Sequence, residues 1–267
     1  MSSVDRVGQL LRGIEDLSDN QLKILASVAN ALKVPVDFVE FKSSDLATAD
    51  FVETMANLLT LHHALHEAPL SKKPFEYSFK NCLLAQDSKA QLNPSPGDSA
   101  YDVSGLGQRW SLKTEAAKGI SSKTVRIEKF MEARWVRECS SPEQCAHEVR
   151  NRVPAHMTGY DRIVVLRAFP KGDFVEYSLD EVPKSLLLDC FGQAKAEQFE
   201  KKGRSISFGA DFYIDGPQYP KKAFRLLLDS SVEKLRLWYE LSHVIRHGVW
   251  RVRASEIRTA QQNSSVP

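Results

Sequence analysis

The residues best suited to chemistry gather in one short stretch of this 267-residue chain, between Asp102 and Glu115. Asp102 offers a carboxylate, and Ser111, Lys113 and Glu115 follow at alternate positions. Carboxylates beside an ammonium and a hydroxyl are the groups that hold a divalent cation and activate a water molecule. The types and spacing of these side chains therefore predict a metal-assisted hydrolytic site.

The elements that must position these groups are two short strands around a glycine-containing turn. We expect the first strand to end at 100–103 and the second to span 109–115. Because side chains alternate between the faces of a strand, Trp110, Leu112 and Thr114 would form one face and the polar residues the other. Alternating charges are also typical of any half-exposed strand, and that interpretation stays open.

A second acid is expected from the segment that follows. After a loop at 116–122, the apolar spacing predicts a helix to about Glu138, in which Glu128 and Glu132 lie four positions apart. One of these glutamates would lean toward Lys113. The alternative is an amphipathic helix whose glutamates pair with neighbouring basic side chains.

The front of the chain is expected to form a helical layer. Apolar residues at helical spacing predict helices within 3–34 and over 45–67. Glu53 on the second of these is a further candidate acid. His62 and His66 lie one turn apart, as zinc ligands can, but beyond the run 62–66, which also holds His63, no further Cys or His lies close in sequence, which favours ordinary surface or half-buried histidines.

Patterning predicts further elements along the chain. Irregular structure is expected over 68–99, apart from one short segment at 77–85, because prolines and a glycine punctuate it. The continuous apolar run at 161–169 predicts an internal strand, with 174–179 as its hairpin partner. The remaining expectations are helices at 145–152 and 183–191, a closing strand at 246–253 and a disordered polar tail after residue 255.

Composition bounds the class of protein. Hydrophobic residues make up 42% of the chain and charged residues 26%, which predicts a folded globular protein. No apolar run approaches the ~18 residues of a membrane span and no secretory signal is visible, so we expect a cytoplasmic protein. The cysteines are scattered and fit free thiols better than a zinc site. They are Cys82, Cys139, Cys145 and Cys190.

Positive charge concentrates in the last part of the chain. Residues 201–258 carry twelve Lys and Arg against six Asp and Glu, a balance of +6, whereas the whole chain carries only +2. Binding to a phosphate backbone requires such a positive surface, although a charge run is also typical of a solvated face. Arginines are expected to read bases and two lysines to contact the backbone. The candidates are Arg236, Arg246, Arg251 and Arg253, with Lys201 and Lys202.

Several motifs, taken in order, resemble the PD-(D/E)XK nuclease superfamily and its type II restriction endonucleases. They are Asp102 with Ser111-Leu-Lys113, the glutamate-rich run 127–135, the pair of segments 175–180 and 182–184, and the closing His247-Gly-Val-Trp250. The resemblance covers roughly residues 98–253. It implies an α/β (α+β) fold with a mixed central β-sheet flanked by helices. It also implies Mg²⁺-dependent cleavage of double-stranded DNA at a short, usually palindromic site by a homodimer.

The chain departs from the family pattern at two positions. Ser111 stands where an acid is expected and Tyr101 where a proline is expected. In some restriction enzymes of the superfamily the second acid moves to the next helix, so the resemblance implies Asp102, Ser111, Lys113 and Glu128 as catalytic residues. Asp102 and Glu128 would hold the metal. The alternative acids are Glu115, Glu132 and Glu53.

The expected organisation has three parts. A helical N-terminal portion (1–70) would pack on a catalytic and DNA-recognition domain (71–258), followed by a disordered tail (259–267). The expected function is that of a type II site-specific deoxyribonuclease. The alternatives are a repair or defence nuclease of the same superfamily without site specificity, and a DNA-binding regulator that uses the basic C-terminal part without catalysis.

Overall fold

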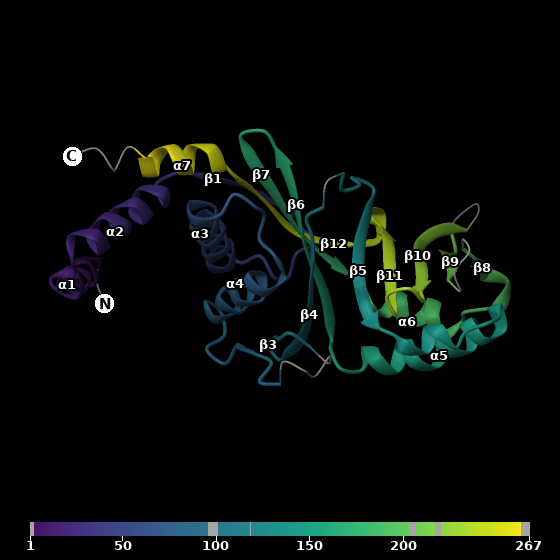
Figure 1. Ribbon diagram of the computed structural model, residues 1–267. Helices are drawn as coiled ribbons and strands as arrows, with labels where there is room; N and C mark the ends of the chain where they lie inside the picture. Colours follow the sequence, from purple (N-terminus) through teal and green to yellow (C-terminus); the bar gives the residue numbers. More distant parts are fainter. Residues whose placement is uncertain (1–2, 96–100, 118, 203–206, 217–219, 263–267) are drawn as a thin grey trace.

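The structure, a computed structural model, describes residues 3–95, 101–117, 119–202, 207–216 and 220–262. Within these residues the chain forms two β-sheets with helices around them (Figure 1). The predicted mixed central sheet flanked by helices is confirmed. None of the described helices is long and apolar enough to cross a membrane. The four cysteines are free thiols, as predicted.

The larger sheet has the strand order β1-β12-β7-β6-β4-β3-β2. Its strands are β1 (Val36–Glu40), β2 (Gln91–Leu92), β3 (Val103–Gly105), β4 (Gln108–Glu115), β6 (Arg162–Lys171), β7 (Phe174–Val182) and β12 (Ile245–Val252). β4 and β6 run parallel and the other neighbours antiparallel, so the sheet is mixed. A parallel pair needs a long crossover, and here the crossover carries β5 and α5.

The second sheet is antiparallel, with the order β5-β11-β10-β9-β8. Its strands are β5 (Thr124–Glu132), β8 (Phe199–Lys201), β9 (Phe208–Ile214), β10 (Lys221–Asp229) and β11 (Lys234–Glu240). Most of the basic C-terminal part therefore lies in this sheet, and β12 returns the chain to the larger one.

Helices flank both sheets (Figure 1). They are α1 (Ser3–Ile14), α2 (Asp19–Ala31), α3 (Ala49–Leu65), α4 (Lys72–Leu84), α5 (Pro142–Met157), α6 (Lys184–Gly192) and α7 (Ala254–Gln262), with short 3₁₀ turns at Arg134–Arg137, Ala196–Gln198 and Leu241–His243. α3, α4 and α7 lie on one side of the larger sheet, and α5 and α6 accompany the second sheet.

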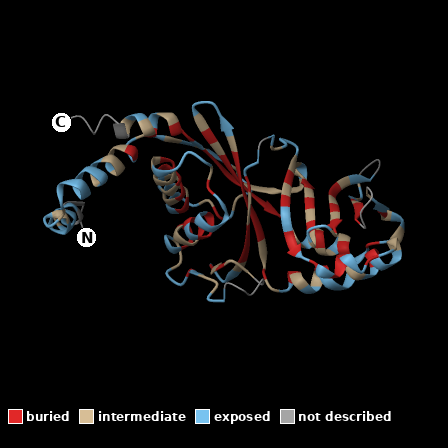
Figure 2. Ribbon diagram, viewed as in Figure 1, coloured by how far each residue is buried: buried red, intermediate tan, exposed pale blue. Residues whose placement is uncertain are grey.

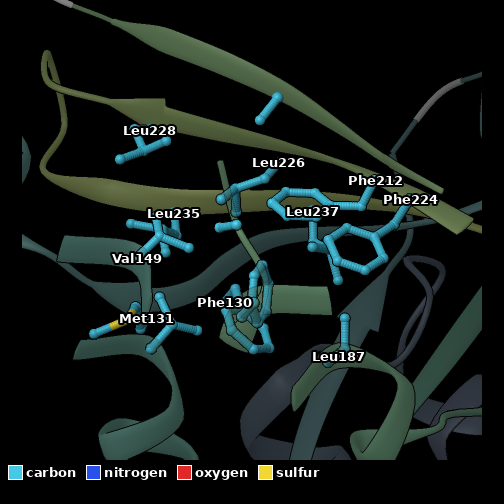
Figure 3. Packing of buried hydrophobic residues seen from close by; sticks show 14 of the residues in the cluster. Phe130, Met131, Val149, Leu187, Phe212, Phe224, Leu226, Leu228, Leu235 and Leu237 are labelled. Atoms are coloured by element: carbon cyan, nitrogen blue, oxygen red, sulfur yellow. The ribbon is translucent and has the colours of Figure 1, made fainter. Parts of the chain in front are cut away.

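Buried apolar residues form two cores, one on each face of the larger sheet. Val164 and Leu166 of β6 pack with α3 and α4, whereas Ile163 and Val165 join the core of the second sheet. Figure 2 shows the central strands buried along most of their length, and Figure 3 shows leucine and phenylalanine side chains filling the second core. The predicted internal strand, its hairpin partner and both later helices are confirmed.

The helix expected to run to Glu138 is wrong, because Thr124–Glu132 forms strand β5. Val125 and Ile127 are buried and their neighbours more exposed, which is the two-residue period of a strand. The register with β11 then shifts, and Phe130 and Met131 become buried side by side. Such a bulge breaks the alternation and imitates the three-to-four-residue spacing of a helix.

Three further expectations need correction. The helix within 68–99 begins at Lys72, because Pro74 falls in its first turn, where proline is tolerated. The tail was expected to be disordered, yet α7 extends to Gln262 and its Ile257 is fully buried; residues 263–267 lie outside the described residues. The first strand begins at Val103, later than expected, and Ala100 also lies outside the described residues.

The N-terminal portion contributes more than a helical layer. Its strand β1 pairs along β12 at one edge of the larger sheet, and α3 shares the core with that sheet. The division into 1–70, 71–258 and a tail stays a proposal.

Candidate active site

Strand β4 separates its apolar side chains from its polar ones, as predicted. Trp110 and Leu112 are fully buried among residues of α3 and α4. Ser111 and Lys113 lie opposite β6 residues that belong to the other core. The polar face of β4 therefore lies toward the second sheet.

Asp102 lies where β3 separates from β4. The last pair between these strands joins Val103 and Trp110. Beyond it the Leu112 N–H donates to Asp102 Oδ2 at 2.6 Å, so a carboxylate takes the place of a strand partner. This hydrogen bond holds Asp102 close to Lys113, and the negative charge of Asp102 acts to raise the pKa of the Lys113 ammonium. The structure brings together the two side chains on which the nuclease prediction depends, while their roles stay proposals.

Glu76 of α4, which the sequence patterns did not single out, shares this environment. Its Oε1 lies 3.5 Å from Nζ of Lys72, and the same ammonium donates to Asp102 Oδ1 at 3.0 Å. Glu76 is only 7% exposed, beside the buried rings of Phe75 and Phe79. A carboxylate among buried apolar residues of a helix indicates that a hydrogen-bond or charged partner lies nearby. This signal can be recognised only when the helix is known to begin at Lys72 and so to include Glu76.

The charges around Lys113 decide its protonation. Burial, together with the neighbouring charges of Lys72 and Lys129, lowers the pKa of Lys113 from 10.5 to about 8, whereas Asp102 and Glu76 act in the opposite direction. At neutral pH the side chain is therefore mostly a cation, but one that releases its proton more readily than an exposed lysine. Perturbed lysines of this kind concentrate at reaction centres.

Glu128 and Glu132 are not joined to this group by any contact among the described residues. Both are exposed on β5. The carboxylate of Glu128 pairs with Arg126, and it lies 3.6 Å from Nε of Arg236. Glu132 pairs with Lys129. The sequence favours Glu128 as second metal ligand only if Glu128 lies on a helix, whereas the structure places it on strand β5.

Glu115 lies on the polar face of β4 but is held in a buried ion pair. Its Oε2 accepts from Nε of Arg167 at 2.6 Å, and Arg167 also lies 3.5 Å from Asp180. Burial raises the pKa of the Glu115 carboxyl, and Arg167 counteracts that shift. Removing one partner of such a pair costs about 3–5 kcal/mol, because the other charge is left buried and unpaired, so replacement of Glu115 is expected to destabilise the fold. Glu53 is exposed on α3, and no described contact joins it to Asp102.

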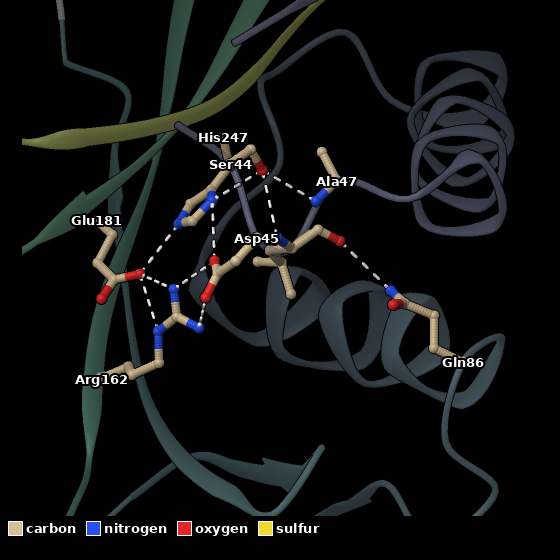
Figure 4. Close-up of polar contacts among 8 residues, drawn as sticks. Ser44, Asp45, Ala47, Gln86, Arg162, Glu181 and His247 are labelled. Atoms are coloured by element: carbon tan, nitrogen blue, oxygen red, sulfur yellow. Dashed lines mark hydrogen bonds and ion pairs between the residues drawn. The ribbon is translucent and has the colours of Figure 1, made fainter. Parts of the chain in front are cut away.

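A second acidic group lies near the start of β6 (Figure 4). Asp45, Glu181 and His247 offer ligand atoms within 4.8 Å of one another. The guanidinium of Arg162 lies among them, with Nη1 2.9 Å from Asp45 Oδ2 and Nε 2.9 Å from Glu181 Oε2. His247 Nε2 lies 3.0 Å from the same glutamate. Arg162 already forms hydrogen bonds with the carboxylates of both Asp45 and Glu181. This group therefore attaches the segment before α3 to the larger sheet.

The donors around Lys72 fit Mg²⁺ better. Carboxylates of Asp102 and Glu76 come from different elements and meet at one ammonium, so both can reach a single cation. Mg²⁺ prefers one or two carboxylates, with water and phosphate oxygens completing its shell. Residues 111–115 of β4 pair with β6 on one side only among the described strand pairs, which leaves this edge open.

The candidate DNA-binding arginines all have acidic partners. The closest contacts are 3.0 Å for Arg236 with Asp229, 3.4 Å for Arg246 with Asp180, 2.9 Å for Arg251 with Glu176 and 3.2 Å for Arg253 with Asp37. Lys202 pairs with Glu200, and Lys201 is exposed. These residues are distributed over both sheets.

Comparison with known proteins assigns this chain to a family. The family model SmaI, described as type II site-specific deoxyribonuclease, matches residues 10–252, which is most of the chain. The chain belongs to this family. The type II restriction enzyme SmaI of Serratia marcescens is 31% identical to it over 214 residues, which cover 78% of this chain and 82% of that protein. No solved structure gives a match.

Membership of the SmaI family makes this chain a DNA-cleaving hydrolase and confirms the resemblance to type II restriction endonucleases. The matched residues include α4, β3 and β4, and so every side chain of the Asp102–Glu76–Lys113 group. Most of α1 lies before the matched residues.

Proposed function

We propose that this member of the SmaI family cleaves double-stranded DNA at a short palindromic site as a Mg²⁺-dependent homodimer. The observation that supports it best is the convergence of Asp102, Glu76 and Lys113 at the open edge of β4. A cytoplasmic location belongs to the same proposal, because four free thiols suit a reducing compartment.

In this proposal Asp102 and Glu76 hold Mg²⁺. The ion, when bound, supplies positive charge to the scissile phosphate and lowers the pKa of a water. Lys113 orients the attacking water and offsets charge on the phosphate as the new bond forms. Ser111 lies two residues earlier on the same face of β4, and its hydroxyl holds that water by a hydrogen bond. Glu128, Glu132, Glu115 and Glu53 remain alternative acids.

The function is tested by incubating the purified chain with plasmid and phage DNA, with Mg²⁺ or with EDTA. We expect discrete fragments with Mg²⁺ and intact DNA with EDTA. A smear would instead support a nuclease without site specificity, for repair or defence. A gel shift without any cleavage would support a DNA-binding regulator and contradict the proposal.

We also propose that the basic C-terminal part carries base recognition. The arginines to test are Arg236, Arg246, Arg251 and Arg253. Replacing one that reads a base should cost about 1–3 kcal/mol of cognate binding and relax the choice at one base pair. Replacing Lys201 or Lys202 should weaken binding to all sequences alike. Because each arginine has a carboxylate partner, binding a base requires exchange of that partner.

The measurement is binding of each alanine variant to cognate and scrambled duplexes over a salt series. A base-reading arginine shows a reduced ratio of cognate to scrambled affinity, and a backbone lysine shows a flatter salt dependence. If all four arginine variants keep the full ratio, recognition lies outside the C-terminal part.

The homodimer is supported by an arm formed by α1 and α2 (Figure 1). Val7, Leu10 and Leu11 are more than half exposed on α1, although a short isolated helix is unstable in water. We propose that a second copy covers them. In an antiparallel pair of α1 helices related by a two-fold axis between Gly8 and Gln9, Val7 meets the partner's Leu10, and Asp5 meets the partner's Arg12.

Replacing both Leu10 and Leu11 with aspartate is therefore expected to give a monomer. Sedimentation velocity over a concentration series measures the change. Leu65→Asp is the matched control, because Leu65 is 69% exposed on α3 and lies outside the arm. A double variant that sediments as a dimer like the wild type would exclude the arm as the interface.

A further inference from the structure

Lys72 lies between the two carboxylates that are proposed to hold Mg²⁺. Its Nζ is 3.0 Å from Asp102 Oδ1 and 3.5 Å from Glu76 Oε1. The neighbouring Lys73 contacts the other oxygen of Glu76 at 2.8 Å, and among the described residues no hydrogen bond or ion pair joins it to Asp102. One ammonium thus bridges acids from two different elements.

The environment of these acids makes a counter-charge necessary. The Asp102 side chain is 18% exposed and that of Glu76 9% exposed. Two largely buried carboxylates facing one site repel each other unless a cation lies between them. The Lys72 ammonium supplies that charge, and it does so at the place where a divalent ion would bind both acids.

The Lys72 ammonium can also move away from the two carboxylates. Lys72 lies in the first turn of α4 and its side chain is 47% exposed, so the ammonium can move into solvent while the helix stays in place. Holding an exposed lysine in one position costs side-chain entropy, and the ion pair it forms there contributes only a modest free energy. The Lys72 ammonium is therefore weakly held.

We propose that Lys72 is a positioning residue that holds Asp102 and Glu76 together before the metal arrives and competes with the metal for them. The inference rests on the proposed function, because it takes these two acids as the metal ligands. Binding of a divalent ion then displaces the ammonium. The displaced ammonium moves into solvent and leaves both carboxylates to the metal.

Competition predicts the sign of a metal-binding experiment. Removing Lys72 takes away a cation that the metal must displace and leaves the acids with one more net negative charge. We therefore expect Lys72→Met to bind Mn²⁺ about tenfold more tightly than the wild type, since a partly buried ion pair contributes on that scale. If Lys72 were only a structural support, its loss would weaken metal binding.

The test uses the full chain without DNA and Mn²⁺ as a paramagnetic probe. Free Mn²⁺ is followed by electron paramagnetic resonance during titration of wild type, Lys72→Met, Lys72→Arg and Asp102→Asn. Lys72→Arg keeps the charge and should stay close to the wild type. Lys73→Met is the matched control from the same turn, and its effect should be about threefold or less because it frees one oxygen of one acid. Lys72→Gln replaces the methionine variant if that variant melts early.

The outcomes separate the two proposals. Tighter binding by Lys72→Met, together with weak binding by Asp102→Asn, supports both. Unchanged or weaker binding by Lys72→Met, with Asp102→Asn still weak, overturns the role of Lys72 and leaves the metal site standing. Binding that Asp102→Asn does not weaken overturns the metal site and the role of Lys72 with it.

Discussion

Replacing Lys113 with alanine is expected to slow cleavage by about a thousandfold, the scale on which loss of a charge-stabilising group acts. The ammonium lies on the polar face of β4 and is mostly protonated at neutral pH, since its pKa is lowered only to about 8. Its removal leaves the attacking water without an orienting group and the phosphate without a counter-charge. Single-turnover cleavage in Mg²⁺ measures the loss, and gel shifts in Ca²⁺ measure DNA binding, which should persist.

The control for Lys113 comes from the same strand. Thr114 is the next residue, and its side chain points to the opposite face of β4, so Thr114→Ala should cleave at close to the wild-type rate. Wild-type cleavage by Lys113→Ala would place the chemistry elsewhere in the chain.

Glu76→Gln is expected to lose Mg²⁺-supported cleavage by about 10²–10³-fold, whereas Glu128→Gln should lose little. Glu76 is buried and shares the Lys72 ammonium with Asp102. Glu128 is exposed and is paired with arginines. The sequence predicted Glu128 as the second ligand and did not single out Glu76; we now favour Glu76, because the segment after Lys113 forms a strand and not a helix.

The glutamine substitutions keep size and hydrogen-bonding capacity, so thermal melting should change little. Cleavage rates over a Mg²⁺ series measure the effect, and excess Mg²⁺ should restore part of the activity of Glu76→Gln. A result in which Glu128→Gln is the more impaired variant would return Glu128 to the role of second ligand.

Local patterns were enough to predict the part of the site that lies on β4. The alternation of Trp110 and Leu112 with Ser111 and Lys113 has the two-residue period of a strand, and the structure keeps it. The apolar run of β6 likewise needed no knowledge of distant residues. These signals are local. A strand buried on one face has apolar residues at every second position, and a strand buried on both faces has a continuous apolar run.

The second acid could not be predicted in this way, because its position depends on pairing between distant segments. The register shift opposite β11 buries Phe130 and Met131 together, and in the sequence this resembles a helix stripe. In α4, Pro74 falls in the first turn of the helix, and because proline also favours irregular structure, the sequence pattern does not reveal this turn or Glu76 within it. Only the tertiary packing of α4 beside β4 reveals that these acids share a cation.

If Asp102 organises a metal-dependent nuclease site, Asp102→Asn should abolish cleavage, and single-turnover kinetics of this variant measure that loss. The asparagine carbonyl can still accept the Leu112 N–H that Asp102 binds at 2.6 Å, so the fold is preserved while the charge is removed. With Mg²⁺ and DNA that the wild type cuts into discrete fragments, we expect the variant to bind the DNA, to melt like the wild type and to leave the DNA uncut. Discrete fragments formed by Asp102→Asn at the wild-type rate would contradict this expectation.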